Sequence, residues 1–301
     1  MAQPSPHPSG VAAEAVGVEP PAASSWSRLA AYLLVGELVV LYAPTARFLW
    51  QHWTVDVWHN AHGVLVPPVV AYLIYRELRR FEGPPPTPNA WGFALFLPAL
   101  AVQALDAGMH TQLLSAASIL VVLPALSLLL LGTARTRAIL FPLLFLAAAL
   151  PIPLGMTEQI HMQLRLLATV SSGWVVSMLG IPVFAEGTTL YLAPGPLEIS
   201  DACSGFSTLY AAAAVACLTA HTAPTATRKL LVLASAAPLA IAANILRIVL
   251  LTVLVVCEGP EVLNTYLHPL SGMMTFAIAL PIIFWLGSDS GARHPAVEAT
   301  T

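Results

Sequence analysis

The chain has 301 residues, of which 57% are hydrophobic and only 9% are charged, and its net charge is −3. Soluble globular domains carry about 25% charged residues, so this composition excludes a soluble protein. Long continuous apolar runs, in place of alternating residues, argue against an outer-membrane barrel and indicate an all-α integral membrane protein. The three cysteines form no CxxC pair, and we expect neither a zinc site nor a disulfide framework.

The two ends of the chain differ from its middle. Residues 1–25 are rich in Pro, Ala and Ser, which predicts a disordered cytoplasmic tail. Residues 26–287 form a single predicted membrane domain, and residues 288–301 a polar C-terminal tail. The first apolar run begins near Leu29 without a preceding basic region, so we expect a retained span and not a cleaved signal peptide.

The apolar runs predict about eight transmembrane helices. The predicted spans are residues 29–42, 62–80, 91–105, 113–131, 138–150, 203–220, 230–256 and 268–286. Residues 47–61 are rich in Trp and His and are predicted as a loop, and residues 106–110 as a short turn.

Two further elements interrupt this series. In residues 158–180 a polar face recurs at helical spacing, opposite an apolar face; its members are Glu158, His161, Arg165, Thr169 and Ser172. This pattern is typical of an amphipathic helix on a membrane surface, or of one that lines a polar cavity. After it, β-prone residues are punctuated by Glu186-Gly187 and Pro194-Gly195-Pro196, which predicts a short β-hairpin.

Basic residues set the orientation, because short loops rich in Lys and Arg stay in the cytoplasm. The basic clusters are Arg76/Arg79/Arg80, Arg135/Arg137 and Arg228/Lys229. They fall on one side, with both termini, only if residues 158–180 do not cross the membrane. This arrangement predicts that the hairpin and Cys203 lie on the extracytoplasmic face.

Three reactive residue types then meet near that face. Cys203 opens the sixth predicted span and His268 the eighth, while Arg247 lies late in the seventh, near the outer boundary. A cysteine becomes a nucleophile when an imidazole takes its proton, and a guanidinium suits an oxyanion forming at an attacked carbonyl. The set predicts acyl transfer from a peptide bond through a thioester.

Each of these residues also has a plainer interpretation. A free cysteine is often a small buried hydrophobe, and an arginine near an interface often snorkels. Asn244 precedes Arg247 by one helical turn, and we expect it to orient the guanidinium. Gly205 is expected to let a substrate backbone come close, and Ser200 or Asp201 to cap the helix that follows.

The remaining candidates are assigned from their positions. His62 is expected to contact the site or substrate. Glu186 and Asp201 are expected to be solvated, with substrate binding as the alternative, and Cys217 is predicted to be buried packing. The spacing of His52, His59 and His62 fits no tetrahedral metal site, so no metal is predicted. No cofactor and no nucleic-acid partner are expected. Cys257 lies on the predicted outer side, where an oxidised pair with Cys203 is conceivable.

Several motifs together resemble one known family. Ala202-Cys203-Ser204-Gly205, Asn244-x-x-Arg247 and His268-x-x-x-Gly272 resemble, in order and spacing, the three motifs of the exosortase/archaeosortase family. The likeness extends to His62-Gly63-x-Leu65-Val66-x-Pro68, Leu150-Pro-Ile-Pro153 and Gly180-Ile-Pro-Val183, and it covers residues 26–285. Phe206-Ser207 depart from the leucine and arginine expected after the cysteine motif.

The resemblance implies a membrane cysteine peptidase or transpeptidase in the bacterial inner membrane. Cys203 would be the nucleophile, Arg247 the oxyanion or substrate stabiliser and His268 the general acid/base, with Asn244, His62, Ser204, Gly205 and Glu186 in supporting or substrate-binding positions. Its partners would be membrane lipids and exported proteins that end in a short motif, a transmembrane helix and a basic cluster.

Two other functions compete with this interpretation. The chain could be a transporter or export component for a polysaccharide or lipid-linked sugar, with Arg247 as an anion site, although no internal repeat is found. It could also be an inactive scaffold.

Overall fold

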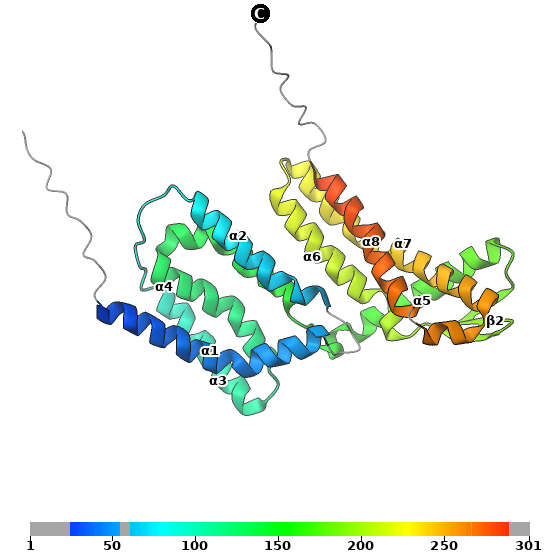
Figure 1. Ribbon diagram of the computed structural model, residues 1–301, viewed down its shortest axis with the longest axis horizontal. Helices are drawn as coiled ribbons and strands as arrows, with labels where there is room; N and C mark the ends of the chain where they lie inside the picture. Colours follow the sequence, from blue (N-terminus) through cyan, green and yellow to red (C-terminus); the bar gives the residue numbers. More distant parts are fainter. Residues whose placement is uncertain (1–24, 55–60, 266, 289–301) are drawn as a thin grey trace, which may run out of the picture. The chain divides into compact units, whose positions relative to one another are not determined.

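The structure is a computed structural model that describes residues 25–54, 61–265 and 267–288 (Figure 1). It divides into two units, Met1–Ala43 and Pro44–Thr301. The first unit contributes the first part of helix α1, and the second holds every other element. Two tails were predicted, at residues 1–25 and 288–301. Of these, only Ser25, which begins α1, and Ser288 belong to the described residues.

Helix α1, Ser25–Thr54, is longer than the predicted first span. It contains Pro44 and continues through residues that we expected to form a loop, so the loop prediction is wrong for residues 47–54. The last turn of the helix is held by a tertiary contact, because Trp53 Nε1 donates to the Ala149 carbonyl at 2.8 Å. That partner is 96 positions away, and no local pattern shows it.

Helices α2, Val66–Arg80, and α3, Gly92–Met109, follow. Helix α3 ends later than predicted, and the left-handed residue His110 follows it. Asp106 lies inside this helix and is fully buried, where its carboxylate accepts hydrogen bonds from Thr111 and, at 2.9 Å, from the Ser115 backbone N–H. These bonds join the end of α3 to the start of the next helix, so residues 106–109 are helical and not a turn.

Helix α4, Leu113–Phe145, is broken at Gly132. The φ of 78° and ψ of 176° at Gly132 are not helical, and this break separates the two predicted spans of this region. A Cβ at this position would collide with the Thr87 carbonyl, because the proline-rich link pairs with Gly132 as an isolated bridge. The break therefore needs glycine for both its conformation and its space. A 3-10 turn, η2, Leu146–Ala149, continues the chain.

Helix α5, Leu154–Met178, corresponds to the predicted amphipathic segment. Most of its polar face is turned inward, since His161, Thr169 and Ser172 are buried and Arg165 is half-buried. Glu158, at the start of this face, is exposed, as are Leu167 and Trp174 on the opposite face. The buried part of the polar face packs against other elements of the protein, including α7 and the turn before α6. The two predicted environments of this helix, a membrane surface and a polar cavity, both stay predictions.

The predicted hairpin is confirmed and gains a third strand. Strands β1, Val183–Glu186, β2, Thr189–Leu192, and β3, Gly195–Glu198, pair antiparallel in the order β1-β2-β3. The register pairs Glu186 with Thr189 at one turn and Leu192 with Gly195 at the other.

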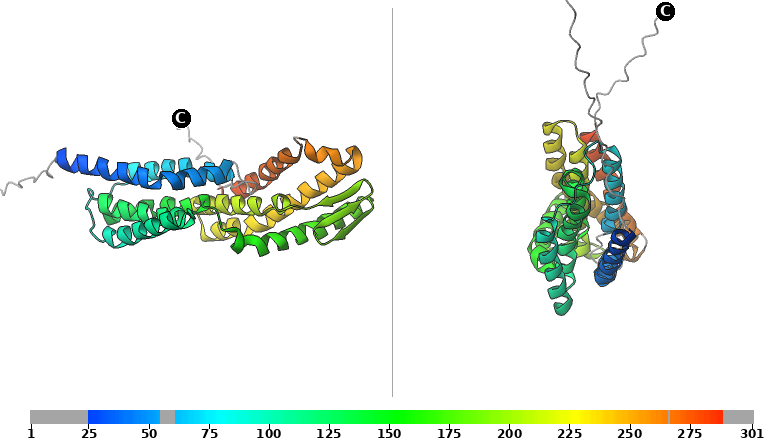
Figure 2. Two further views of the ribbon diagram at one scale, coloured as in Figure 1. Left: turned by 90° about the horizontal axis from the view of Figure 1, so that it is seen from below. Right: turned by 90° about the vertical axis from the view of Figure 1, so that its left-hand side faces the viewer.

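The last helices pack together. A 3-10 turn, η3, Asp201–Cys203, leads to α6, Phe206–Thr222, which is followed by α7, Ala226–Glu258, the turn η4, Pro260–Asn264, and α8, Leu267–Gly287. Helices α6, α7 and α8 contact one another, and α7 also contacts α5 (Figures 1 and 2). Between α5, β2, β3, α7 and η4 lies a buried cluster that includes Leu190, Ile199, Cys203 and Ile248.

Among the described residues, five helical segments are long and apolar enough to cross a membrane. They are Tyr32–Thr54, Gly92–Met109, Leu113–Ala149, Ala226–Glu258 and Leu270–Gly287. Helices α2 and α6 have 15 and 17 residues, which at 1.5 Å per residue is shorter than a hydrocarbon core of about 30 Å. The all-α membrane class is therefore supported, while the number of eight spans stays a prediction.

Candidate active site

Cys203 lies in the turn η3, between strand β3 and helix α6. It is buried, with 6% of its surface exposed, and α6 begins three residues later than the predicted span. Neither Ser200 nor Asp201 caps α6, so that prediction is wrong: Gly205 occupies the N-cap position, and Ser204 Oγ accepts a hydrogen bond from Phe206 N–H at 3.2 Å.

Asn244 on α7 holds the cysteine turn from one side. Its Nδ2 donates to the Cys203 carbonyl oxygen at 3.0 Å, and the residue is 2% exposed. Gly205 has a φ of 84°, and a Cβ there would lie 2.7 Å from Asn244 Cγ. Gly205 therefore admits the Asn244 side chain, where we expected a substrate backbone. Asn244 contacts the cysteine turn, whereas the sequence suggested that it orients Arg247.

Arg247, one turn further along α7, contacts the third motif. Its Nε donates to Ser271 Oγ at 3.0 Å, and a Cβ on Gly272 would lie 3.9 Å from Arg247 Cζ. Both partners belong to the segment His268-x-x-Ser271-Gly272. The motif Asn244-x-x-Arg247 thus joins the cysteine turn to the start of α8.

The guanidinium lies in an apolar setting. Arg247 and Ser271 line a cavity of about 260 Å³ between α7 and α8, whose other lining residues include Leu246, Leu250 and Leu270. Among the described residues, the Nη1 and Nη2 groups of Arg247 have no hydrogen-bond partner. A cation with unused donors beside apolar walls is suited to an anionic or polar group of a ligand.

His268 is described only through its backbone. It is the second residue of α8, and its side chain lies outside the described part of the chain. Positions three apart share a helix face, so His268 is on the side of α8 that carries Ser271, the partner of Arg247. The role of His268 as general acid/base stays a prediction.

His62 lies at a second group of contacts, around the turn η2. Its Nε2 donates to the Ala148 carbonyl at 3.1 Å, and its ring packs edge-on against Tyr210 of α6 with centroids 4.9 Å apart. Burial lowers the pKa of His62, although the hydrogen bond to Ala148 opposes this effect. An indirect link to the cysteine turn runs through Tyr210 and Phe206, whose ring centroids are 6.3 Å apart.

Other predicted residues lie on elements other than the cysteine turn. Glu186 is exposed at the end of β1. Cys217 is exposed, so the prediction that it is buried packing is wrong, and Cys257 is exposed as well; all three cysteines are free. His59 lies outside the described residues. Within residues 25–54, 61–265 and 267–288, no group of three His, Cys, Asp or Glu side chains is arranged to hold a metal.

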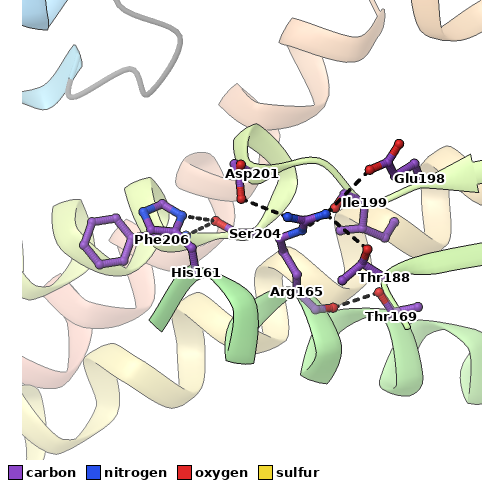
Figure 3. Close-up of polar contacts among 9 residues, drawn as sticks. All are labelled: His161, Arg165, Thr169, Thr188, Glu198, Ile199, Asp201, Ser204 and Phe206. Carbon is purple, nitrogen blue, oxygen red and sulfur yellow. Dashed lines mark hydrogen bonds and ion pairs between the residues drawn. The ribbon is translucent and has the colours of Figure 1, made fainter. Parts of the chain in front are cut away.

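Helix α5 supplies two site residues that the sequence did not assign. Arg165 donates from Nε to the Ile199 carbonyl at 2.7 Å, from Nη1 to Asp201 Oδ1 at 3.1 Å and from Nη2 to Thr188 Oγ1 at 3.1 Å (Figure 3). Its Nη2 is also 3.6 Å from Glu198 Oε1. Asp201, which we expected to be solvated, is thus ion-paired while 42% exposed.

His161, one turn before Arg165, completes this side of the turn. Its Nδ1 shares a hydrogen bond with Ser204 Oγ at 3.1 Å, and its ring lies 4.4 Å from that of Phe206. Burial lowers the pKa of His161, and the positive charge of Arg165 adds to this, while Asp201 opposes it. In the sequence, both residues belong to the polar face at helical spacing. That pattern predicts that they share a helix face, but it does not predict which residues they contact.

The long apolar helices define a multi-pass helical membrane protein, and the buried thiol of Cys203 is its candidate site. A family model described as transmembrane exosortase (Exosortase_EpsH) matches residues 50–285. The chain therefore belongs to the transmembrane exosortase family, and the family predicted from the motifs is confirmed. Comparisons with the curated proteins and with the solved structures gave no match.

Proposed function

We propose that the protein is a membrane cysteine transpeptidase that cleaves the C-terminal sorting signal of exported, membrane-anchored proteins. Family membership supports a transpeptidase in general. The observation that carries the proposal is the pair of contacts made by Asn244-x-x-Arg247: Asn244 binds the Cys203 carbonyl, and Arg247 binds Ser271 beside the His268 motif. One helical turn thus contacts both the cysteine turn and the segment that contains His268.

In the proposed reaction, the Cys203 thiolate attacks the carbonyl carbon of the scissile peptide bond. A C–S bond forms, and the C–N bond breaks when the leaving amine takes a proton from the His268 imidazolium. An acceptor amine, another acceptor nucleophile or water then attacks the thioester and gives its proton back to His268, and the thiolate leaves. The enzyme returns to its starting state, so atoms and charges balance over the cycle.

Arg247 would stabilise the oxyanion that forms during both attacks. Its Nε is used by Ser271, and Nη1 and Nη2 remain for the substrate oxygen. Removing one such donor typically costs a hundredfold or more in rate. Asn244 offers a hydrogen-bond acceptor in place of a donor, because its buried Oδ1 has no partner among the described residues. An unpaired buried acceptor beside the cysteine turn suits a substrate backbone N–H.

The proposed location follows from the charge distribution. Three basic clusters on one side predict that the sheet and Cys203 face the extracytoplasmic side of the bacterial inner membrane. Substrates would be exported proteins whose C-terminal motif reaches Cys203 while their own transmembrane helix stays in the bilayer. The basic cluster that follows this helix would stay in the cytoplasm, which puts the preceding motif on the outer side.

The test is processing of a co-expressed reporter that ends in a sorting-type tail. Cys203→Ala and Cys203→Ser should both be close to inactive, because a hydroxyl ionises far less readily than a thiol. His268→Ala should be similarly impaired, and the double variant hardly worse than either single one, as for groups that share one step. Cys203→Ala should also trap a complex with uncleaved reporter.

Cys217→Ala is the matched control. This cysteine is exposed on α6 and lies about four helical turns after Cys203 in the sequence, so its loss should leave processing unchanged. Processing that survives in Cys203→Ala would refute the proposed nucleophile. Loss of processing in Cys217→Ala would show that the reaction uses a different thiol.

A further inference from the structure

The turn that carries Cys203 is held from two sides. On the α7 side, Asn244 binds the carbonyl of Cys203 itself. On the α5 side, contacts are made before and after the cysteine: Arg165 binds Ile199 and Asp201, and His161 binds Ser204. Four positions in a stretch of six residues are therefore tethered by side chains from two helices.

The Arg165 contacts are suited to fixing the backbone. Its side chain is only 14% exposed, and a charged donor to the Ile199 carbonyl makes a stronger hydrogen bond than a neutral one. The planar guanidinium reaches Ile199, Asp201 and Thr188 at once, which a lysine cannot do from one nitrogen. The end of β3 and the start of η3 thus share a single anchor.

The His161 contact lies on the other side of the cysteine. His161 is 5% exposed, and its partner Ser204 Oγ also accepts the Phe206 N–H that opens α6 (Figure 3). The hydroxyl therefore links three elements: α5, the cysteine turn and the first turn of α6. Because Ser204 adjoins Cys203, a shift of this hydroxyl moves the backbone that carries the thiol.

We propose that His161 and Arg165 are positioning residues that hold the Cys203 turn in place for nucleophilic attack. This inference rests on the proposed function, in which Cys203 is the nucleophile. Neither residue takes part in the bond changes; both act through the backbone and through Ser204. Reaction rates depend steeply on such placement, since a misplacement of about 1 Å can cost about a hundredfold.

The first readout needs no substrate. Cys203 is 6% exposed, so a reagent such as N-ethylmaleimide reaches it only when the turn opens locally. In a Cys217→Ala/Cys257→Ala background, His161→Phe keeps a ring against Phe206 but loses the hydrogen bond. We expect its alkylation to be roughly two- to tenfold faster, the change that corresponds to one net hydrogen bond. Arg165→Lys should be faster by at least as much.

Two substitutions test whether the Nδ1 atom of His161 makes this contact. His161→Asn retains a polar group near the Nδ1 position that can either donate or accept, so its alkylation rate should stay near that of the parent. His161→Gln places its amide near the Nε2 position instead and should resemble His161→Phe. If His161→Phe does not fold, the comparison of Asn with Gln and the Arg165→Lys variant still decide the inference.

Ser172→Ala is the matched control. Ser172 is buried on the same inward face of α5, but its hydroxyl bonds only to carbonyls of its own helix. We expect no change in alkylation. Equal rates for the parent, His161→Phe and Arg165→Lys would overturn the inference, as would equal acceleration by Ser172→Ala.

The second readout is turnover of the reporter. In His161→Phe and Arg165→Lys, kcat should fall with KM unchanged, and His161→Asn should restore kcat. A change confined to KM would mean that these residues bind substrate and would overturn the positioning role. If the parent protein processes no reporter while the alkylation pattern holds, the proposed function fails and the structural role of α5 stands.

Discussion

Gly205→Ala tests the contact between the cysteine turn and α7. Gly205 has a φ of 84°, which costs a residue with a Cβ about 1–2 kcal/mol. The added methyl group would also lie 2.7 Å from Asn244 Cγ and Nδ2, and such overpacking typically costs about 1–3 kcal/mol. We expect Gly205→Ala to lower the free energy of unfolding by about 2–5 kcal/mol.

Gly180→Ala separates these two effects. Gly180 has a similar φ of 81°, but nothing lies within 4 Å of its Cβ position. Its substitution should therefore cost only the conformational part, about 1–2 kcal/mol. The difference between the two variants measures the crowding of Asn244.

The functional consequence follows from the displaced amide. To make room, Asn244 must move away from the Cys203 carbonyl, which it binds at 3.0 Å. Gly205→Ala should therefore lose reporter processing, whereas Gly180→Ala should keep it. In Gly205→Ala/Asn244→Ala the crowding is relieved, so the double variant should be more stable than the sum of the single effects predicts, by about 0.5–3 kcal/mol. Its processing should stay low, because the bond to Cys203 is still absent.

The assay is denaturant or thermal unfolding of the detergent-purified protein, with processing measured in cells. Equal destabilisation by Gly205→Ala and Gly180→Ala would refute the close approach of Asn244. Additive effects in the double variant would refute it independently.

Three further predictions concern other parts of the site and the fold. Arg247→Ala should fold yet process little reporter, and Arg247→Lys should restore only part of the activity because it lacks the planar fork; normal turnover in Arg247→Ala would favour a snorkelling arginine. A cysteine introduced at exposed Glu186, in a background without other cysteines, should react with an impermeant maleimide from outside intact cells, and labelling only after permeabilisation would contradict the proposed topology. Burial lowers the pKa of His62, so the unfolded chain binds more protons than the folded protein, and the free energy of unfolding should fall as the pH drops below about 6.5. His62→Gln keeps a donor for the Ala148 carbonyl but does not titrate. Unfolding measured at several pH values should therefore show a shallower decline for this variant.

Local features of the chain were predictable because their causes are local. Apolar runs predicted the helical membrane class, and the turn residues around Gly187 and Gly195 predicted a hairpin, to which the structure adds a third strand. The spacing of Asn244 and Arg247 placed both side chains on one helix face. The residue types at Cys203, Arg247 and His268 also led us to expect thiol chemistry, which stays a prediction. These inferences needed only periodicity, turn chemistry and the properties of individual side chains.

Contacts between distant elements depended on the tertiary structure. Periodicity showed that His161 and Arg165 share a face of α5, but their partners Ser204 and Ile199 are 43 and 34 positions away. Spacing likewise placed Asn244 beside Arg247, yet its partner is the carbonyl of Cys203, 41 positions earlier. A helical pattern predicts which residues share a helix face, whereas the element that packs against that face is determined only by the tertiary structure.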